Sequence, residues 1–155
     1  MNEGEHDFDA IWREISAQLW RSIYAYAGGS RDVADDAVVE AFARAMERNG
    51  PIRDPKAYIF RIAFRVAAAD MKLRRRQVEL TEQEPGEEPR VSPLLDALRH
   101  LSPSQRAAVY LHYEADLPVR EVAALMGTST AAVKVHLTRG RRRLAVLLGE
   151  GGNDA

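Results

Sequence analysis

The sequence predicts an all-α protein with two small helical domains joined by a flexible acidic linker, the second domain being a helix-turn-helix. Apolar residues recur at helical spacing through most of the 155 residues, and strand-like alternation is absent. Residues 77–91, QVELTEQEPGEEPRV, lose this periodicity and are rich in Glu and Pro, which is typical of a linker. Residues 119–144 have the spacing of a helix-turn-helix. These features place the two domains at residues 8–76 and 92–148.

The first domain is predicted to contain three helices. The first helix runs from Phe8 to Tyr26 and ends at the pair Gly28-Gly29. The second helix follows Asp32, a suitable N-cap residue, and stops before Asn49-Gly50-Pro51. The expected buried stripes of these two helices are Phe8, Ile11, Trp12, Ile15, Leu19, Ile23 and Tyr26, and then Val33, Ala37, Val38, Ala41, Phe42, Ala45 and Met46.

The third helix is predicted from Asp54-Pro55 to Arg76. Asp is a good N-cap, and Pro at the first helical position loses no hydrogen bond, because that N–H has no partner inside the helix. Phe60 and Phe64 are expected in the core. The helix ends in the basic run MKLRRR, where the predicted linker begins.

The second domain shows two capping signals before its main motif. Ser92-Pro93 is expected to begin a short helix that reaches His100. Ser102 and Gln105 have the spacing of a capping box, which predicts the start of the next helix.

The helix-turn-helix is predicted from a small residue, a glycine and an apolar residue at fixed spacing. Ala123 lets two helices cross closely, and Gly127 suits a turn position that requires a positive φ. Ser129 is the expected N-cap of the second helix, and Val133 faces inward. The residues expected to pack with Val133 are Val122, Leu125, Met126 and Leu137.

Charge is segregated along the chain, although the net charge is only −1. Residues 1–50 hold ten acids and five bases, and residues 51–76 hold two acids and eight bases. Residues 77–100 hold six acids and two bases, and residues 101–148 hold three acids and seven bases. This alternation predicts two basic surfaces that face a polyanion, although runs of charge are also common on solvated faces.

The second helix of such a motif enters the major groove of DNA with its N-terminal residues at the base edges. Arginines at its far end suit phosphates, which position the helix without reading sequence. The residues predicted to contact DNA here are Thr130, Ala131, Lys134, Val135, His136, Thr138, Arg139, Arg141 and Arg142. Lys134 and Arg139 are ranked above Arg143 and its neighbours, which could instead pack against the linker.

The sequence offers no catalytic or metal-binding pattern. It has no cysteine, and His6, His100, His112 and His136 do not have metal-ligand spacing. Nothing brings a Ser, a His and an Asp together as a triad. We therefore expect no enzyme activity, no metal and no cofactor. The N-terminus lacks the features of a signal peptide and no apolar run suits a membrane helix, so a cytoplasmic location is expected.

The chain resembles the extracytoplasmic-function (ECF) sigma factors of the sigma-70 family. The first domain resembles their region 2 in DVADDAVVEAFARAMERN and DPKAYIFRIAFRVAAADMKLRRR. The second domain resembles their region 4 in LSPSQRAAVYLHYEADLPVREVAALMGTSTAAVKVHLTRGRRRL. The family pattern D-x-V-Q-E-x-F appears from Asp36 to Phe42 with Val39 in place of Gln. Tyr58-Ile59 replace the usual W-L, and Arg65 or Val66 stands near the usual Asn.

The resemblance implies two partners, RNA polymerase core and promoter DNA. On polymerase, region 2 would bind the clamp helices of the largest subunit and region 4 the flap of the second subunit. Asp36, Glu40 and Glu47 lie on one helix and would provide an acidic face for a basic partner. The resemblance also admits an anti-sigma factor as a partner, and it implies no membrane.

The resemblance further implies that region 4 reads the −35 promoter element and region 2 the −10 element. In region 2, melted bases would be held by polar and aromatic side chains. The residues predicted to contact the −10 element are Arg53, Lys56, Tyr58, Arg61, Arg65, Arg74, Arg75 and Arg76. The linker acids Glu79, Glu82, Glu84, Glu87 and Glu88 would mimic phosphates in the polymerase RNA channel, or would simply keep the linker solvated.

Two alternatives stay open at this point. The VKVH string at residues 133–136 is also typical of response-regulator activators, which would make the chain a conventional helix-turn-helix regulator. A sigma-like mimic that binds polymerase but does not initiate transcription would fit the departures from the −10 motif. Binding to polymerase core separates the regulator from the other two, and promoter melting separates the sigma factor from the mimic.

Overall fold

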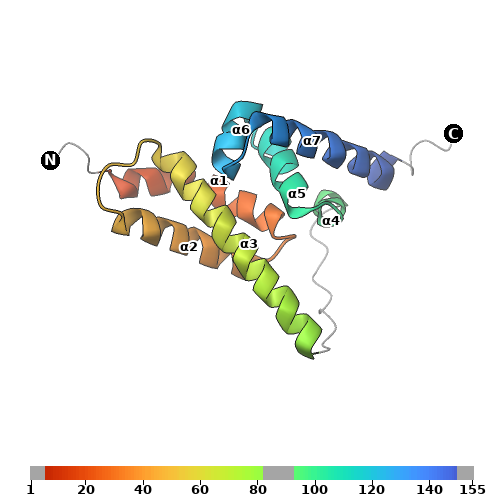
Figure 1. The fold of residues 1–155 in the computed structure, drawn as a ribbon, viewed down its shortest axis with the longest axis horizontal. Helices are drawn as coiled ribbons and strands as arrows, with labels where there is room; N and C mark the ends of the chain where they lie inside the picture. Colours follow the sequence, from red (N-terminus) through yellow and green to blue (C-terminus); the bar gives the residue numbers. More distant parts are fainter. Residues whose placement is uncertain (1–5, 82–92, 150–155) are drawn as a thin grey trace.

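The computed structural model describes residues 6–81 and 93–149, and within these ranges the regular secondary structure is helical throughout. Figure 1 shows a long helix, α3, crossing the molecule, with the C-terminal helices gathered at one end of it. The elements are α1 (Phe8–Tyr26), α2 (Arg31–Glu47), α3 (Pro55–Thr81), α4 (Pro93–Arg99), α5 (Pro103–Val109), a π-helical turn η1 (Tyr110–Glu114), α6 (Val119–Met126), α7 (Thr130–Leu144) and a second π-helical turn η2 (Ala145–Gly149).

The ends of α1 and α2 follow from local chemistry. Gly28 and Gly29 adopt φ values of 71° and 92° and end α1 as predicted, because a side chain is strained in that region. The N-cap of α2 is Ser30, whose hydroxyl accepts from the backbone N–H of Val33 at 3.3 Å. The prediction of Asp32 as the cap was wrong by two residues; Asp32 lies in the first turn, where its charge suits the helix dipole.

Helices α1, α2 and α3 form a compact unit whose core follows the predicted apolar stripes. Phe60 and Phe64 are buried, as expected, and the Tyr26 ring packs edge-on against Phe64. Met46 was wrongly placed in the core, because it is 62% exposed on the outer face of α2. Trp12 is 44% exposed, yet its ring packs against Phe42 in a T-shaped pair with a centroid distance of 4.8 Å.

Helix α3 is five residues longer than the sequence predicted. Asp54 caps its start as expected, accepting from the N–H of Ala57 at 3.1 Å. Residues 77–81, QVELT, continue the helix because they contain neither Gly nor Pro. The rest of the predicted linker, residues 82–91 with four of its five acids, lies outside the described residues.

The second unit is built from α4 to α7 and contains the predicted helix-turn-helix. Ser102 and Gln105 form the predicted capping box at the start of α5. Gly127 takes a left-handed φ of 68° at the end of α6, and Ser129 caps α7 by accepting from Ala132 N–H at 3.1 Å. Val133 is buried in the crossing of the two helices. Each of these local predictions is confirmed.

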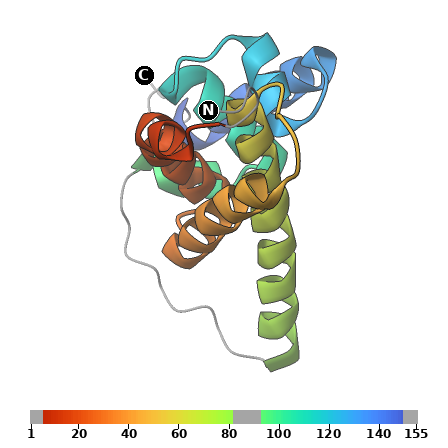
Figure 2. The ribbon, with the colours of Figure 1, turned by 90° about the vertical axis from the view of Figure 1, so that its left-hand side faces the viewer.

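The two units pack directly against each other. Helix α6 lies against the first turns of α3, and α5 lies against α1, as both views show (Figures 1 and 2). Arg99 Nε donates to the carbonyl oxygen of Gly28 at 2.7 Å, and Lys56 Nζ lies 3.1 Å from Glu121 Oε1. One continuous cluster of buried side chains runs through both units. In this arrangement the two units share a core.

Candidate nucleic-acid interface

Helix α7 presents a basic face to solvent because its apolar residues are buried on the other side. Val133 and Leu137 pack into the core, and this burial fixes the rotation of the helix. Seven of the predicted contact residues are exposed, and two are half-buried. The exposed residues are Thr130, Ala131, Lys134, Val135, Arg139, Arg141 and Arg142; His136 and Thr138 are half-buried.

The arginines at the end of α7 are not equivalent. Arg141 Nη1 donates to the hydroxyl of Tyr113 at 2.8 Å, so its side chain lies across η1. Arg139, Arg142 and Arg143 are exposed. Because the Arg141 side chain is already held by Tyr113, it loses less conformational entropy when it binds a phosphate. The end of α7 is therefore suited to contact the DNA backbone, and its first two turns are suited to contact bases.

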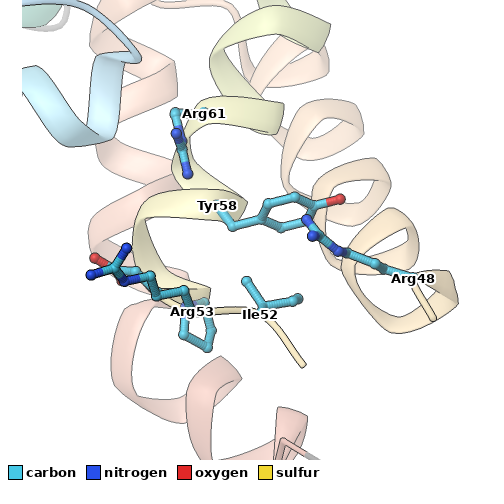
Figure 3. Close-up of a pocket in the computed structure, with 7 residues that line it drawn as sticks. Arg48, Ile52, Arg53, Tyr58 and Arg61 are labelled. Carbon is cyan, nitrogen blue, oxygen red and sulfur yellow. The ribbon is translucent and has the colours of Figure 1, made fainter. Parts of the chain in front are cut away.

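A pocket of about 530 Å³ opens where the loop after α2 meets the start of α3. Figure 3 shows its labelled side chains directed around one hollow. The Arg48 guanidinium carbon lies 4.8 Å from the centroid of the Tyr58 ring, in a cation–π contact. We call this hollow the arginine–tyrosine pocket; its lining residues are Arg48, Ile52, Arg53, Asp54, Pro55, Tyr58 and Arg61.

Three of the residues predicted to contact the −10 element, Arg53, Tyr58 and Arg61, line this pocket together. An aromatic ring offers a surface on which a base stacks, and guanidinium groups offer paired donors to base edges and phosphates. Arg48 was not predicted from the sequence, because it follows α2 and belongs to no basic run. The contact of His6 with this loop was not predicted either; its Nε2 accepts from the backbone N–H of Ile52 at 2.9 Å.

The other residues predicted to contact the −10 element lie outside the pocket. Lys56 is half-buried in its ion pair with Glu121 of α6, and Arg65 is exposed. Arg75 and Arg76 are exposed near the far end of α3.

Arg74 lies among three carboxylates. Its Nε is 2.9 Å from Asp70 Oδ1, and its terminal nitrogens are 3.8 Å from Asp32 Oδ2 and 3.7 Å from Asp36 Oδ2. The hydrogen bond to Asp70 is the main cause that raises the pKa of Arg74 above its ordinary value. This cation is therefore already matched by opposite charge within the first unit.

The acidic residues predicted to bind polymerase all lie exposed on α2. Asp36 is near Arg74, and Glu40 accepts from Arg44 Nε at 2.8 Å in an i,i+4 pair. Glu47 ends the helix. Val39, which is 64% exposed, lies on the outer surface of the same helix. The exposed surface of α2 therefore combines carboxylates with apolar side chains.

Residues 6–81 and 93–149 contain neither a candidate metal site nor a candidate membrane-spanning helix. No group of three or more His, Asp or Glu side chains is placed to hold a metal ion. Within the same residues, no helix is both long enough and apolar enough to cross a membrane.

A helix-turn-helix with a basic second helix, packed on a three-helix unit that carries an arginine–tyrosine pocket, places the chain among the helix-turn-helix proteins. The family described as Sigma-70, region 4 matches residues 92–144, which include the whole helix-turn-helix. The ECF RNA polymerase sigma factor BldN of Streptomyces coelicolor is 34% identical over 164 residues, which cover 94% of this chain. The chain spans 62% of the length of that relative. Residues 92–144 thus match the Sigma-70, region 4 family, and the chain as a whole is similar to an ECF sigma factor.

A solved structure has the same fold. It is the sigma factor RpoE in complex with the anti-sigma factor NepR from Bartonella quintana, with a TM-score of 0.71. The match covers 96% of this chain and 99% of the RpoE chain, at 22% sequence identity. The all-helical architecture is therefore shared across nearly the full length of both chains.

Proposed function

We propose that this protein is an alternative sigma factor that binds RNA polymerase core, directs it to promoters and helps to start transcription. The observation that carries the proposal is that one chain presents two different surfaces whose side chains suit nucleic acid. Helix α7 suits the major groove of duplex DNA, and the arginine–tyrosine pocket suits a base that has left the stack. A conventional regulator needs only the first surface, whereas promoter melting needs both. The chain itself performs no catalytic step.

Each surface has a role under this proposal. The α7 face reads the −35 element, with Lys134 at the bases and Arg139 and Arg142 at phosphates. The arginine–tyrosine pocket reads the −10 element through Arg53, Tyr58 and Arg61. The charge and exposure of Lys134, Arg139, Arg142 and Arg53 support the assignment, as does the position of Tyr58 and Arg61 in the wall of the pocket. Region 2 is then the unit that begins at α1, and region 4 the unit that begins at α4.

Polymerase core is the expected main partner. The exposed carboxylates of α2, Asp36, Glu40 and Glu47, support contact with the basic clamp helices of its largest subunit. Region 4 would contact the flap of the second subunit. Because the RpoE neighbour was solved with NepR, an anti-sigma factor is a further expected partner of this chain.

Run-off transcription with purified core polymerase, this protein and fragmented genomic DNA from its source tests the proposal. Discrete transcripts that require the protein support a sigma factor, and their start sites define both promoter elements. Stable binding to core without transcripts would indicate a sigma-like mimic. No binding to core would overturn the proposal and favour a regulator.

Tyr58 gives a sharper test of the pocket. Replacing Tyr58 with Ala removes the stacking surface, which costs about 1–3 kcal/mol per base, so we expect weaker open-complex formation on duplex promoters. Tyr58→Phe keeps the ring and should retain most activity. Permanganate footprinting of the melted strand measures the effect, with binding to core polymerase as the control. Equal melting by the Ala and Phe variants would contradict base stacking on Tyr58.

A further inference from the structure

The loop between α2 and α3, residues 48–54, forms one wall of the arginine–tyrosine pocket but has little regular structure of its own. Gly50 adopts a φ of 90° with open space around it, and Pro51 has no N–H to donate. Asp54 is committed to capping α3. The conformation of the middle of this loop must therefore be set by contacts with other elements.

The N-terminal segment provides such a contact. Ile52 donates its backbone N–H to His6 Nε2 at 2.9 Å, across 46 positions of sequence. The His6 ring is half-buried and lies edge-on to Phe8, with centroids 6.0 Å apart and an interplanar angle of 69°. The Ile52 side chain is itself buried in the core. Ile52 is thus held through both its backbone and its side chain.

The chemistry of this bond restricts what position 6 can be. Nε2 accepts a hydrogen bond only as a bare ring nitrogen, so the ring proton must be on Nδ1. Without an acceptor there, a partly buried N–H would be left unpaired, which is costly. Arg53 follows Ile52 directly and lines the pocket. A shift of Ile52 would therefore move Arg53 with it.

We propose that His6 is a positioning residue of the arginine–tyrosine pocket, and that its Nε2 lone pair holds the loop where Arg53 meets the −10 element. The inference rests on the proposed function. It adds to that function a role for a residue that precedes α1: His6 affects how well the pocket discriminates between −10 bases. His6 does not touch the nucleic acid, and its effect passes through the Ile52 backbone.

The first test measures the bond itself, independently of transcription. Amide hydrogen exchange at Ile52 is followed in the full chain for the native protein, His6→Gln, His6→Asn and His6→Ala. The Gln side-chain oxygen can lie near the place of Nε2, whereas the Asn oxygen lies nearer that of Nδ1. We expect exchange about three- to tenfold faster in the Asn and Ala variants and near-native exchange in the Gln variant. Equal protection in all four proteins would overturn the proposal.

The second test measures base reading. Holoenzyme is assembled with each variant and assayed on promoters in which every −10 base is changed in turn. We expect His6→Ala and His6→Asn to lose about three- to tenfold of the discrimination between bases. We expect His6→Gln to keep it, and affinity for core polymerase to be equal in all variants. His100→Ala, at an exposed histidine in the second unit, is the matched control.

The two proposals fail in distinguishable ways. If the native chain does not bind core polymerase, the sigma-factor function fails, and the exchange experiment still reports on the His6 bond. If holoenzyme forms and His6→Ala discriminates between −10 bases as the native protein does, the positioning role is overturned. Thermal unfolding of each variant identifies any general loss of folding. The comparison of His6→Gln with His6→Asn then tests whether an acceptor at the place of Nε2 is needed, because the two side chains have similar polarity.

Discussion

Arg74 shows how a single residue can differ from its neighbours in a basic run. The sequence groups Arg74 with Arg75 and Arg76 as candidates for phosphate contact. The structure gives Arg74 three carboxylate neighbours on α2 and α3, whereas Arg75 and Arg76 are exposed. A cation that is already paired gains less from a phosphate, because it must first leave its partners.

Under the proposed function, the salt dependence of promoter binding should distinguish these arginines. Each phosphate contact that is lost lowers the slope of log K against log salt by about one. We expect this change for Arg75→Gln and Arg76→Gln in the holoenzyme, and a much smaller one for Arg74→Gln. The Arg74 change should also destabilise the first unit by less than about 1 kcal/mol, since the pairs are largely exposed. A full unit of slope lost in Arg74→Gln would contradict this ranking.

Tyr26 should make the folded state less stable at alkaline pH. Burial raises the pKa of its hydroxyl, and the nearby Arg106 guanidinium opposes that rise. The folded state therefore keeps the phenol proton at pH values where the unfolded chain, with a pKa of about 10, has lost it. Stability is level below that pH and falls as the pH rises toward the folded pKa.

Tyr26→Phe removes one titrating group, so its stability should fall less steeply above about pH 10. Urea unfolding midpoints between about pH 8 and pH 11 measure the difference. Burial also raises the pKa of Tyr110, so part of the alkaline loss should remain in the variant. Parallel pH profiles for the native protein and Tyr26→Phe would show that Tyr26 does not titrate differently on folding.

The site was only partly predictable at the residue scale. Arg53, Tyr58 and Arg61 were expected to act together because the resemblance places them in one functional segment. His6 could not be found in this way, since its partner is a backbone N–H 46 residues away. Arg48 carries no local signal either, because only the folding of the loop brings it over the Tyr58 ring.

At the scale of elements, capping and turn chemistry were the most predictable features. Ser102, Gly127 and Ser129 act as their residue types require, because a cap or a positive φ is decided by a few neighbouring atoms. The end of α3 was less predictable. A short segment that mixes polar and apolar residues without Gly or Pro allows either a linker or a solvated helix, so the composition of residues 77–81 did not decide between them.

Helix α7 crosses α5 at Gly140, which stands in the sequence within the basic run RGRRR. A β-carbon at position 140 would lie 2.8 Å from Val109 Cγ2. Overpacking typically costs about 1–3 kcal/mol, which exceeds the gain of about 1 kcal/mol from the better helix propensity of Ala. Gly140→Ala should therefore lower the free energy of unfolding and weaken DNA binding through α7.

The partner of Gly140 provides a matched control. Val109→Ala alone should destabilise by leaving a cavity, but in the double variant it creates room for the new methyl group. The double variant should then be more stable than the sum of the two single effects predicts, and a double-mutant cycle by urea unfolding measures this coupling. If the two changes in unfolding free energy were strictly additive, the new methyl group at position 140 would be accommodated without a clash with Val109.

At the scale of the whole molecule, the closed packing of the two units covers part of the surface proposed to read the −10 element. Lys56 is paired with Glu121, and the methylene carbons of Arg61 lie close to Gly127 of the turn. Under the proposed function, nucleic acid that contacts Lys56 and Arg61 has to displace α6. The proposed function therefore requires the two units to separate, or at least to move apart at α3.

Arg106 is a buried cation where the two units meet, and it should limit the stability of the closed form. It is 8% exposed, its Nε has no hydrogen-bond partner among the described residues, and Nη1 reaches only the carbonyls of Arg99 and Leu101 at 3.5 and 3.4 Å. Burial is the main cause that lowers the pKa of Arg106. Burying a charge with so few partners costs desolvation energy, and this cost destabilises the closed form.

Arg106→Met keeps most of the side-chain volume and removes the charge. We expect the thermal midpoint to rise by a few degrees and transcription to fall, because the closed form becomes harder to open. Arg106→Lys, which keeps a cation, is the control. Energy transfer between dyes on α2 and α7 measures the population of the closed form. A lower midpoint together with a more open Met variant would contradict this account.

Both tryptophans of the chain, Trp12 and Trp20, lie in α1. Trp12 contacts Phe42, and the Trp20 indole donates to Asp35 at 2.7 Å, so both rings sense the contact of α1 with α2. Tryptophan fluorescence, excited selectively, therefore comes from the first unit, whereas circular dichroism reports on the helices of both. Superimposable unfolding curves would mean that the shared core makes the molecule one cooperative unit, and separated curves would mean that its halves melt independently.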